Sequence, residues 1–145
     1  MKMLLLTVDD KVQIVDLRND WRDLSSAVDS TMADRVAIQN QDVFQAKPDL
    51  KKYVMLIDGE SLLKRNNVCN PLASILYNTH EHGHPVMGNV LLARANSTEH
   101  FRELVKEKEE TLADLQKFLS ERIELLASGG VIDDLHGTYD GVHLD

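Results

Sequence analysis

The stretch that decides how this chain is arranged runs from Asn96 to Ser128 and reads NSTEHFRELVKEKEETLADLQKFLSERIELLAS. It contains no proline or glycine, and Gly129-Gly130 follows it, which is typical of a helix end. At its start, Asn96 precedes Glu99 by three residues, the spacing of a helix-capping box. The sequence therefore predicts one uninterrupted helix over residues 96–128.

The apolar residues of this predicted helix recur along one face, in part at strict seven-residue spacing. A helix of this length would measure about 45 to 50 Å, whereas a body of about a hundred residues has a radius of gyration near 13 Å. We therefore expect the helix to project and to pair with a second copy of the chain. The expected oligomer interface consists of Phe101, Val105, Leu112, Leu115, Leu119 and Leu126. Two alternatives are a helix folded back over its own sheet and a hairpin bent near Ser120.

Length and charge divide the chain into a body, the long helix and a tail. The 145 residues, 43% of them apolar, suit a single domain over residues 1–95, followed by the helix at 96–128 and an acidic tail at 129–145. The net charge is −8, and the tail holds four aspartates and no lysine or arginine. A nucleic-acid binder needs a surplus of basic residues, so nucleic acid is not an expected partner.

The first part of the body reads as a hairpin, a helix and a strand. Two β-prone runs at 3–8 and 11–17 are joined by Asp9-Asp10, a pair that suits a tight turn. Asp20 is placed to cap a short helix that begins at Trp21. A third strand is expected at 35–38.

The second part of the body alternates loops with the most apolar segments. The polar stretch 39–52 reads as a loop, and the apolar run 53–57 reads as a strand closed by a turn at Asp58-Gly59, with 61–63 returning beside it. Asn70-Pro71 marks a helix start, and 86–93 reads as the last strand. The expected fold is α+β, a small mainly antiparallel sheet with two short helices, then one long C-terminal helix and the tail.

Three short motifs connect residues 1–94 with a known group of proteins. They are Ile57-Asp58-Gly59, Asn70-Pro71-Leu72-Ala73 and Gly88-Asn89-Val90. With the N-terminal hairpin, this order resembles a family of small uncharacterised proteins, a domain of unknown function found mostly in phages and bacterial mobile elements. Paired glycines common in that family are replaced here by Met32-Ala33-Asp34. The resemblance implies an origin and a fold but no reaction, and it favours a phage accessory role such as counter-defence.

A basic loop before the Asn70 helix start is the preferred ligand site. Lysine, arginine and asparagine side chains near a helix N-terminus can converge on an anion. The expected ligand-binding residues are Lys64, Arg65, Asn66, Asn67, Asn70, Asn89 and Arg94. The alternative interpretation is a solvated loop whose asparagines make local turns and caps.

Metal and enzyme chemistry have weaker support in the sequence. His80, His82 and His84 alternate and would share one side of an extended segment, which could hold a divalent metal, although Gly83 and Pro85 favour a polar turn. No nucleophile and base are recognisable as a hydrolytic pair, so we expect no cofactor and favour a non-enzymatic role. The single cysteine, Cys69, excludes an internal disulfide and indicates a reducing compartment.

These observations support three hypotheses of function. The first is a non-enzymatic, oligomeric phage or mobile-element protein that binds and sequesters a small anionic, nucleotide-like ligand. The second is an inhibitor that binds a host defence protein through the long helix and the acidic tail. The third is a metal-dependent enzyme using the three histidines. In each case we expect the bacterial host cytoplasm, because the apolar run at 3–8 is too short to span a membrane or to form a signal peptide.

Overall fold

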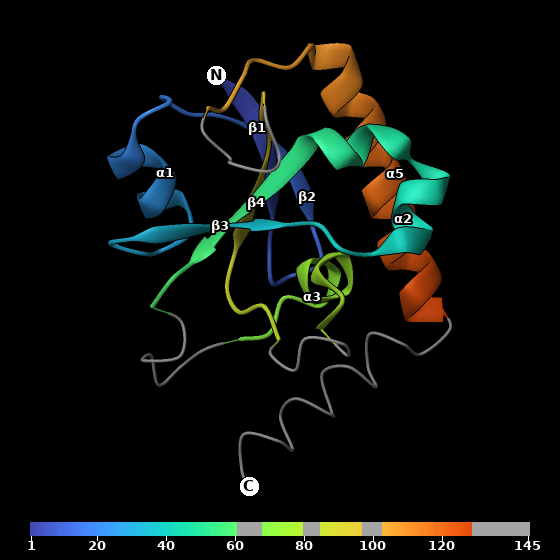
Figure 1. The fold of residues 1–145 in the computed structure, drawn as a ribbon. Helices are drawn as coiled ribbons and strands as arrows, with labels where there is room; N and C mark the ends of the chain where they lie inside the picture. Colours follow the sequence, from blue (N-terminus) through green and yellow to red (C-terminus); the bar gives the residue numbers. More distant parts are fainter. Residues whose placement is uncertain (61–67, 80–84, 97–102, 129–145) are drawn as a thin grey trace, which may run out of the picture.

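The computed structural model describes residues 1–60, 68–79, 85–96 and 103–128, and in them five strands form one antiparallel sheet (Figure 1). The strand order is β2-β1-β5-β4-β3, and every neighbouring pair is antiparallel. The strands are β1 (Lys2–Leu6), β2 (Val12–Asp16), β3 (Ala33–Ala37), β4 (Tyr53–Asp58) and β5 (Val90–Arg94). This arrangement confirms the expected α+β class.

Local turn and cap chemistry places the first elements as predicted. The β1–β2 hairpin closes through Thr7 N–H donating to the Lys11 carbonyl at 2.9 Å, and Asp10 adopts a left-handed backbone with φ 64°. Aspartate tolerates that conformation better than most residues. Asp20 then accepts a hydrogen bond from Asp23 N at 2.9 Å and caps α1 (Trp21–Ala27), as its sequence position indicated.

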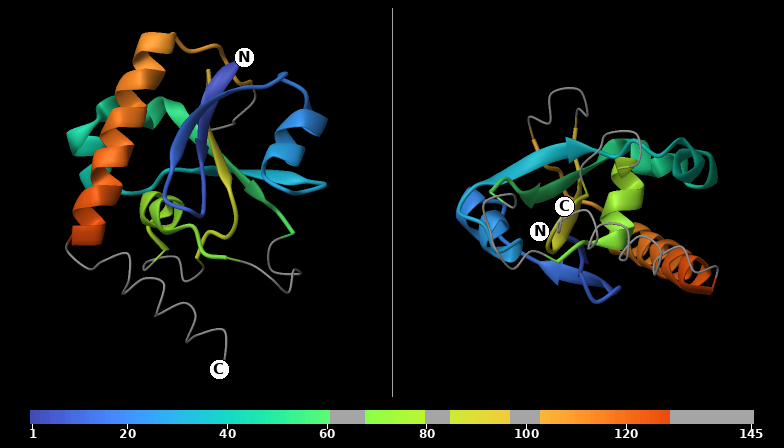
Figure 2. Two further views of the ribbon diagram at one scale, coloured as in Figure 1. Left: turned by 180° about the vertical axis from the view of Figure 1, so that it is seen from behind. Right: turned by 90° about the horizontal axis from the view of Figure 1, so that it is seen from below.

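Both faces of the sheet are covered, so the central strands are apolar on both sides. Alternate residues of β5 point in opposite directions, Val90 and Leu92 toward one cluster of buried side chains and Leu91 and Ala93 toward the other. α1 covers one face, while α2 (Gln41–Ala46), α3 (Pro71–Tyr77) and α5 (Glu109–Ser128) cover the other (Figure 2). This double burial explains the continuous apolar runs that mark β4 and β5 in the sequence.

The expected loop at 39–52 is instead two short helices, which corrects the sequence interpretation. Asn40 caps α2 by accepting from Val43 N at 3.1 Å, and a 3₁₀ helix, η1 (Pro48–Lys52), follows. Each is too short to show a periodic pattern. Val43 and Leu50 pack both helices against the sheet, and these tertiary contacts cannot be recognised from the local sequence.

The prediction of one helix from Asn96 is also wrong, because α5 begins at Glu109. Residues 103–108 are not helical; Leu104 bridges Ala95, and Val105 N donates to the Arg94 carbonyl at 2.9 Å. The segment therefore runs back beside the end of β5. The side chain of Asn96, expected to cap the helix, donates to Glu103 Oε2 at 3.0 Å.

The apolar face of α5 is buried by its own chain, so the expectation of a projecting helix is wrong. Leu112, Leu115 and Leu119 belong to the core cluster on the face that α5 covers. At 20 residues the helix is about 30 Å long, short enough to lie along the sheet. The alternative of a helix folded back over its own sheet is the one observed (Figure 1). Oligomerisation stays a prediction. The apolar helix face from which it was inferred is buried within the chain.

The remaining differences concern strand boundaries. The third strand begins at Ala33, earlier than expected, and the last begins at Val90, later than expected. Gly88, expected within the last strand, precedes it with φ 79°, a conformation that glycine adopts without strain. The proposed return strand at 61–63 lies outside the described residues. None of the helices described here has the length and apolar character needed to cross a membrane.

Candidate functional site

A buried polar cluster fixes the point at which α5 begins. Glu107 is 7% exposed, and its carboxylate accepts hydrogen bonds from Tyr53 Oη at 2.7 Å and from Arg94 Nη1 at 3.1 Å. The backbone N–H of Lys108 also donates to it, at 2.8 Å. Tyr53 and Arg94 come from paired positions of β4 and β5, so Glu107 joins the chain before α5 to the middle of the sheet.

The electrostatics of this cluster favour an ionised Glu107. Burial opposes ionisation, but the hydrogen bonds from Tyr53 and the Lys108 backbone, with the positive charge of Arg94, hold the pKa of Glu107 below its ordinary value. Burial and the hydrogen bond to Glu107 raise the pKa of Tyr53 well above its usual range. Tyr53 therefore stays a neutral donor. Three hydrogen-bond donors surround the Glu107 carboxylate, so the cluster stabilises the fold and holds the chain before α5 on the sheet.

Two further contacts hold α5 along its length. Near its start, Glu109 forms an ion pair with Lys2 of β1. Further along, Gln116 Nε2 donates to the carbonyl of Val12 at 2.9 Å. Val12 belongs to the edge strand β2, so this bond also satisfies part of an open sheet edge. One side of α5 is thereby committed to the sheet and the opposite side faces solvent.

The solvent side of α5 carries a row of carboxylates, which we call the acidic face: Glu110, Asp114, Glu121 and Glu124. These four residues are separated by four, seven and three positions and so lie within about 80° of arc on the helix. All four are exposed, and none forms an ion pair within the described residues. Lys117 is the one exposed base among them. The acidic face is therefore negative charge without ion pairs in the described part of the chain, at positions that the helix backbone fixes.

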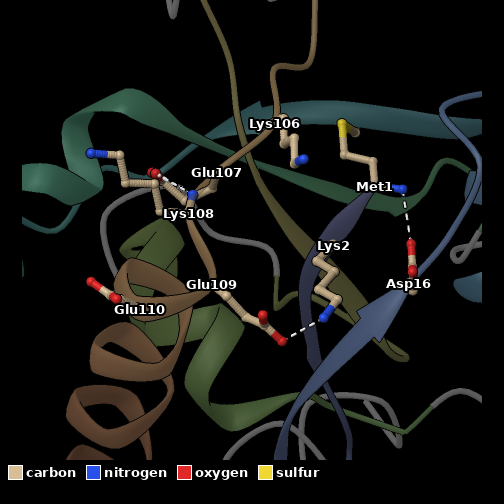
Figure 3. A pocket seen from close by; sticks show the side chains of 8 residues that line it. All are labelled: Met1, Lys2, Asp16, Lys106, Glu107, Lys108, Glu109 and Glu110. Carbon is tan, nitrogen blue, oxygen red and sulfur yellow. Dashed lines mark hydrogen bonds and ion pairs between the residues drawn. The ribbon is translucent and has the colours of Figure 1, made fainter.

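A cleft of about 810 Å³ lies beside the start of α5 (Figure 3). Its walls are the beginning of β1, the end of β2 and residues 106–110. Three lysines face four carboxylates there, and two of these carboxylates, Asp16 and Glu109, already hold the terminal amine and Lys2. Counting the terminal amine, the lining carries four positive and four negative groups, a balance that does not favour an anionic ligand.

Two of the predicted ligand residues are used by the fold itself. Asn70 is 0% exposed; its Nδ2 donates to the carbonyls of Leu6 and Gly88 at 3.0 and 2.9 Å, and its Oδ1 caps α3 by accepting from Ala73 N. Asn89 Oδ1 accepts from Val8 N at 3.1 Å. These amides join the β1–β2 hairpin to β5 and α3. The cap of α3 by Asn70 is the kind of local contact that the alternative interpretation expected, whereas the bonds to Leu6, Gly88 and Val8 are long-range.

Arg94 does not join this group. It lies at the far end of β5 from Gly88 and Asn89, about 13 Å along the strand from Val90 at 3.3 Å per residue, and its charge is paired with Glu107. The other predicted ligand residues, Lys64, Arg65, Asn66 and Asn67, lie outside the described residues. Of the three predicted ligand residues that are described, Asn70 and Asn89 lie close together and Arg94 lies apart from them.

The metal and thiol candidates gain no support from the described residues. His80, His82 and His84 lie outside them, and the described part of the chain has no cluster of three or more histidine, cysteine, aspartate or glutamate side chains suited to a metal. Cys69 is buried, with its Sγ 3.6 Å from Ser74 Oγ. Of the predicted interface residues, Phe101 lies outside the described part, Val105 is half-buried before the helix, and the side chain of Leu126 is not described.

Sequence reasoning missed Tyr53, Glu107 and the acidic face. Glu107 lies between two exposed lysines, a pattern typical of a solvated segment, and its partners are 54 and 13 residues away. No local signal marks it. The acidic face could have been found once the buried leucines were assigned to the sheet, because the opposite side of the same helix is then known. Comparisons of the chain with protein-family models, with curated proteins and with solved structures find no match.

Proposed function

We propose that this chain is a non-enzymatic accessory protein that binds a basic partner protein through the acidic face of α5. The observation that carries the proposal is the row of four exposed carboxylates, none of them ion-paired with a described residue, on a helix anchored at its start and along its buried side. Because the helix backbone that carries these charges is already ordered, binding a partner requires no further ordering of the backbone. A surface rich in lysine and arginine is the complement that such a row selects.

The resemblance to phage and mobile-element proteins suggests a biological role for this binding. It supports a counter-defence role in the bacterial cytoplasm, in which the partner is a host defence protein with a basic functional surface. The net charge of −8 and the four aspartates of the tail add to the same attraction. The hypothesis of a nucleotide-like ligand is less well supported, since Asn70, Asn89 and Arg94 are committed to internal contacts.

The test compares two variants that remove equal charge from different surfaces. Asp114→Asn with Glu121→Gln neutralises the centre of the acidic face, whereas Asp9→Asn with Asp34→Asn neutralises two exposed carboxylates elsewhere. Host proteins captured by the wild type are identified, and the affinity of each purified candidate is measured for all three proteins. We expect a basic partner whose affinity falls at least about tenfold for the first variant only.

The same affinities measured at several ionic strengths provide a second test. Binding by the wild type and by the Asp9 and Asp34 variant is expected to weaken steeply as ionic strength rises, because exposed charges are screened. The acidic-face variant is expected to show a shallower dependence. Equal affinities for the two variants, or a partner without a basic surface, would contradict the proposal.

A further inference from the structure

A small cavity lies where α2, α3 and α5 meet, on the face of the sheet opposite α1. Its volume is about 210 Å³, and its apolar walls come from all three helices: Val43, Leu72, Ile75, Leu76 and Leu119. Four of these side chains are buried and Ile75 is half-buried, so the cavity is a lined pocket open at one side. Binding sites for small molecules commonly combine such apolar walls with a few polar groups.

Three polar residues also line the cavity: Asn40, the exposed Asp42 and the half-buried Arg122. The amide is fully used, because Asn40 Oδ1 accepts from Val43 N and its Nδ2 donates to the Ile75 carbonyl, both at 3.1 Å. In contrast to this hydrogen-bonded amide, the charged side chains of Asp42 and Arg122 are not ion-paired within the described residues, with each other or with any third group. The guanidinium carbon of Arg122 lies over the Phe118 ring, 5.3 Å from its centre.

We propose that this cavity binds a free α-amino acid with an apolar side chain. The side chain would occupy the apolar walls, the carboxylate would accept hydrogen bonds from Arg122, and the ammonium would donate to Asp42. A guanidinium can hold a carboxylate by two parallel hydrogen bonds, and the contact to the half-buried Arg122 is strengthened beside a low-dielectric wall. Asp42 is exposed, so its contact with the ammonium contributes less. The site is independent of the acidic face and of any partner protein.

Size and charge together select this ligand class. An apolar cavity of about 150 Å³ holds a benzene ring, so about 210 Å³ is enough for a branched aliphatic or phenyl side chain with part of its head group. A simple anion would meet the carboxylate of Asp42, and a simple cation would meet Arg122. Only a molecule that carries both charges beside an apolar group satisfies all three features of the lining.

The ligand test uses L-leucine and L-phenylalanine, each added to the full chain and followed by calorimetry and by the methyl resonances of Ile75 and Leu119. Two comparison compounds each lack one charge of leucine: 4-methylpentanoate has no ammonium, and 3-methylbutylamine has no carboxylate. We expect saturable binding of at least one amino acid, with shifts at both methyl groups, and binding at least about tenfold weaker for each comparison compound.

Variants then assign the contacts. Arg122→Gln and Asp42→Asn are each expected to weaken amino-acid binding by about tenfold to hundredfold, whereas the matched surface changes Arg18→Gln and Asp9→Asn leave it unchanged. Ile75→Phe fills the cavity from its half-buried wall and is expected to abolish binding. Thermal unfolding of the same variant shows that it is folded. The absence of saturable binding by both amino acids, equal binding of a singly charged analogue, or unchanged affinity in the Arg122 and Asp42 variants would overturn the proposal.

Discussion

Glu107 keeps a charged side chain in the interior because three donors surround its carboxylate. The donors are the Tyr53 hydroxyl, the Arg94 guanidinium and the Lys108 backbone N–H. A buried charge without such partners is strongly destabilising, and a buried charge with them fixes one arrangement of the chain. The residue therefore decides where the extended segment ends and α5 begins.

Removing one donor should test this role. Tyr53→Phe deletes the hydroxyl that donates to Glu107 and leaves the ring in place. We expect the free energy of unfolding to fall by about 1.5–3 kcal/mol, since the bond is made to a buried charged acceptor. Urea denaturation of Tyr53→Phe, Glu107→Gln and the double variant measures it. Strictly additive losses would contradict a direct interaction between the two side chains.

Acid should remove the contribution of Glu107. Its pKa in the folded chain lies below the ordinary value of 4.5, so folding favours the ionised form. The stabilisation is therefore complete above about pH 4.5 and is lost as the pH falls through the lower, folded-state pKa. We expect the stability difference between the wild type and Glu107→Gln to shrink over that range. A difference that stays constant from neutral to acidic pH would show that the charge is not responsible.

Asn70 should be required for stability rather than for ligand binding. Asn70→Ala removes the cap of α3 and leaves the carbonyls of Leu6 and Gly88 without their donor, at an expected cost of about 2–4 kcal/mol. Asn70→Asp keeps the capping oxygen but loses the donors, so it should also destabilise. Thermal unfolding compares both with Asn19→Ala, an exposed asparagine expected to be neutral. Wild-type stability in the Asn70 variants would contradict this role.

At the scale of elements, α5 shows how the same apolar spacing serves two different structures. Leucines at helical spacing are typical both of a coiled coil and of a helix lying on a sheet, so the pattern alone left the partner open. The bridge between Ala95 and Leu104 turns the chain back before the helix begins. The buried side of the helix is then satisfied within one chain, and its acidic face remains for another molecule.

The position of Leu115 distinguishes these two structures experimentally. It is 0% exposed in the intramolecular core, so Leu115→Ala should lower the free energy of unfolding by about 2–5 kcal/mol at every protein concentration. Leu125→Ala, at a position that is 64% exposed on the same helix, is the matched control and should change little. Thermal unfolding at several concentrations measures both. A loss that depends on concentration would instead indicate that Leu115 lies between two copies of the chain.

At the scale of the whole molecule, the sheet is most protected at its centre. β5 pairs with β1 and β4 and is buried on both faces, whereas β3 forms an edge. We expect native-state hydrogen exchange to be slowest in β5 and fastest, among the strands, in β3, with β2 intermediate because Gln116 holds its edge. Faster exchange at Leu91 than at Val36 would contradict the strand order.

The sequence by itself determined the features whose causes are local. The turn at Asp9-Asp10, the caps at Asp20 and Asn70 and the presence of the apolar strands predicted at 53–57 and 86–93 each depend on residues within a few positions. Each could be predicted, although the last strand begins only at Val90. The acidic face of α5 could be predicted only in part. The sequence shows the excess of acidic residues, but it does not show that four of them lie on the exposed side of the helix.

Tertiary structure alone decided the start of α5, the burial of Glu107 and the outward direction of the acidic face. Tyr53 and Glu107 are 54 positions apart, and Val12 and Gln116 are 104 apart. Contacts over such separations are absent from any local pattern. They favoured an extended segment at 103–108 over the helix that local propensity predicted, because packing and hydrogen bonds to the sheet outweigh the few tenths of a kcal/mol by which each residue prefers a helix.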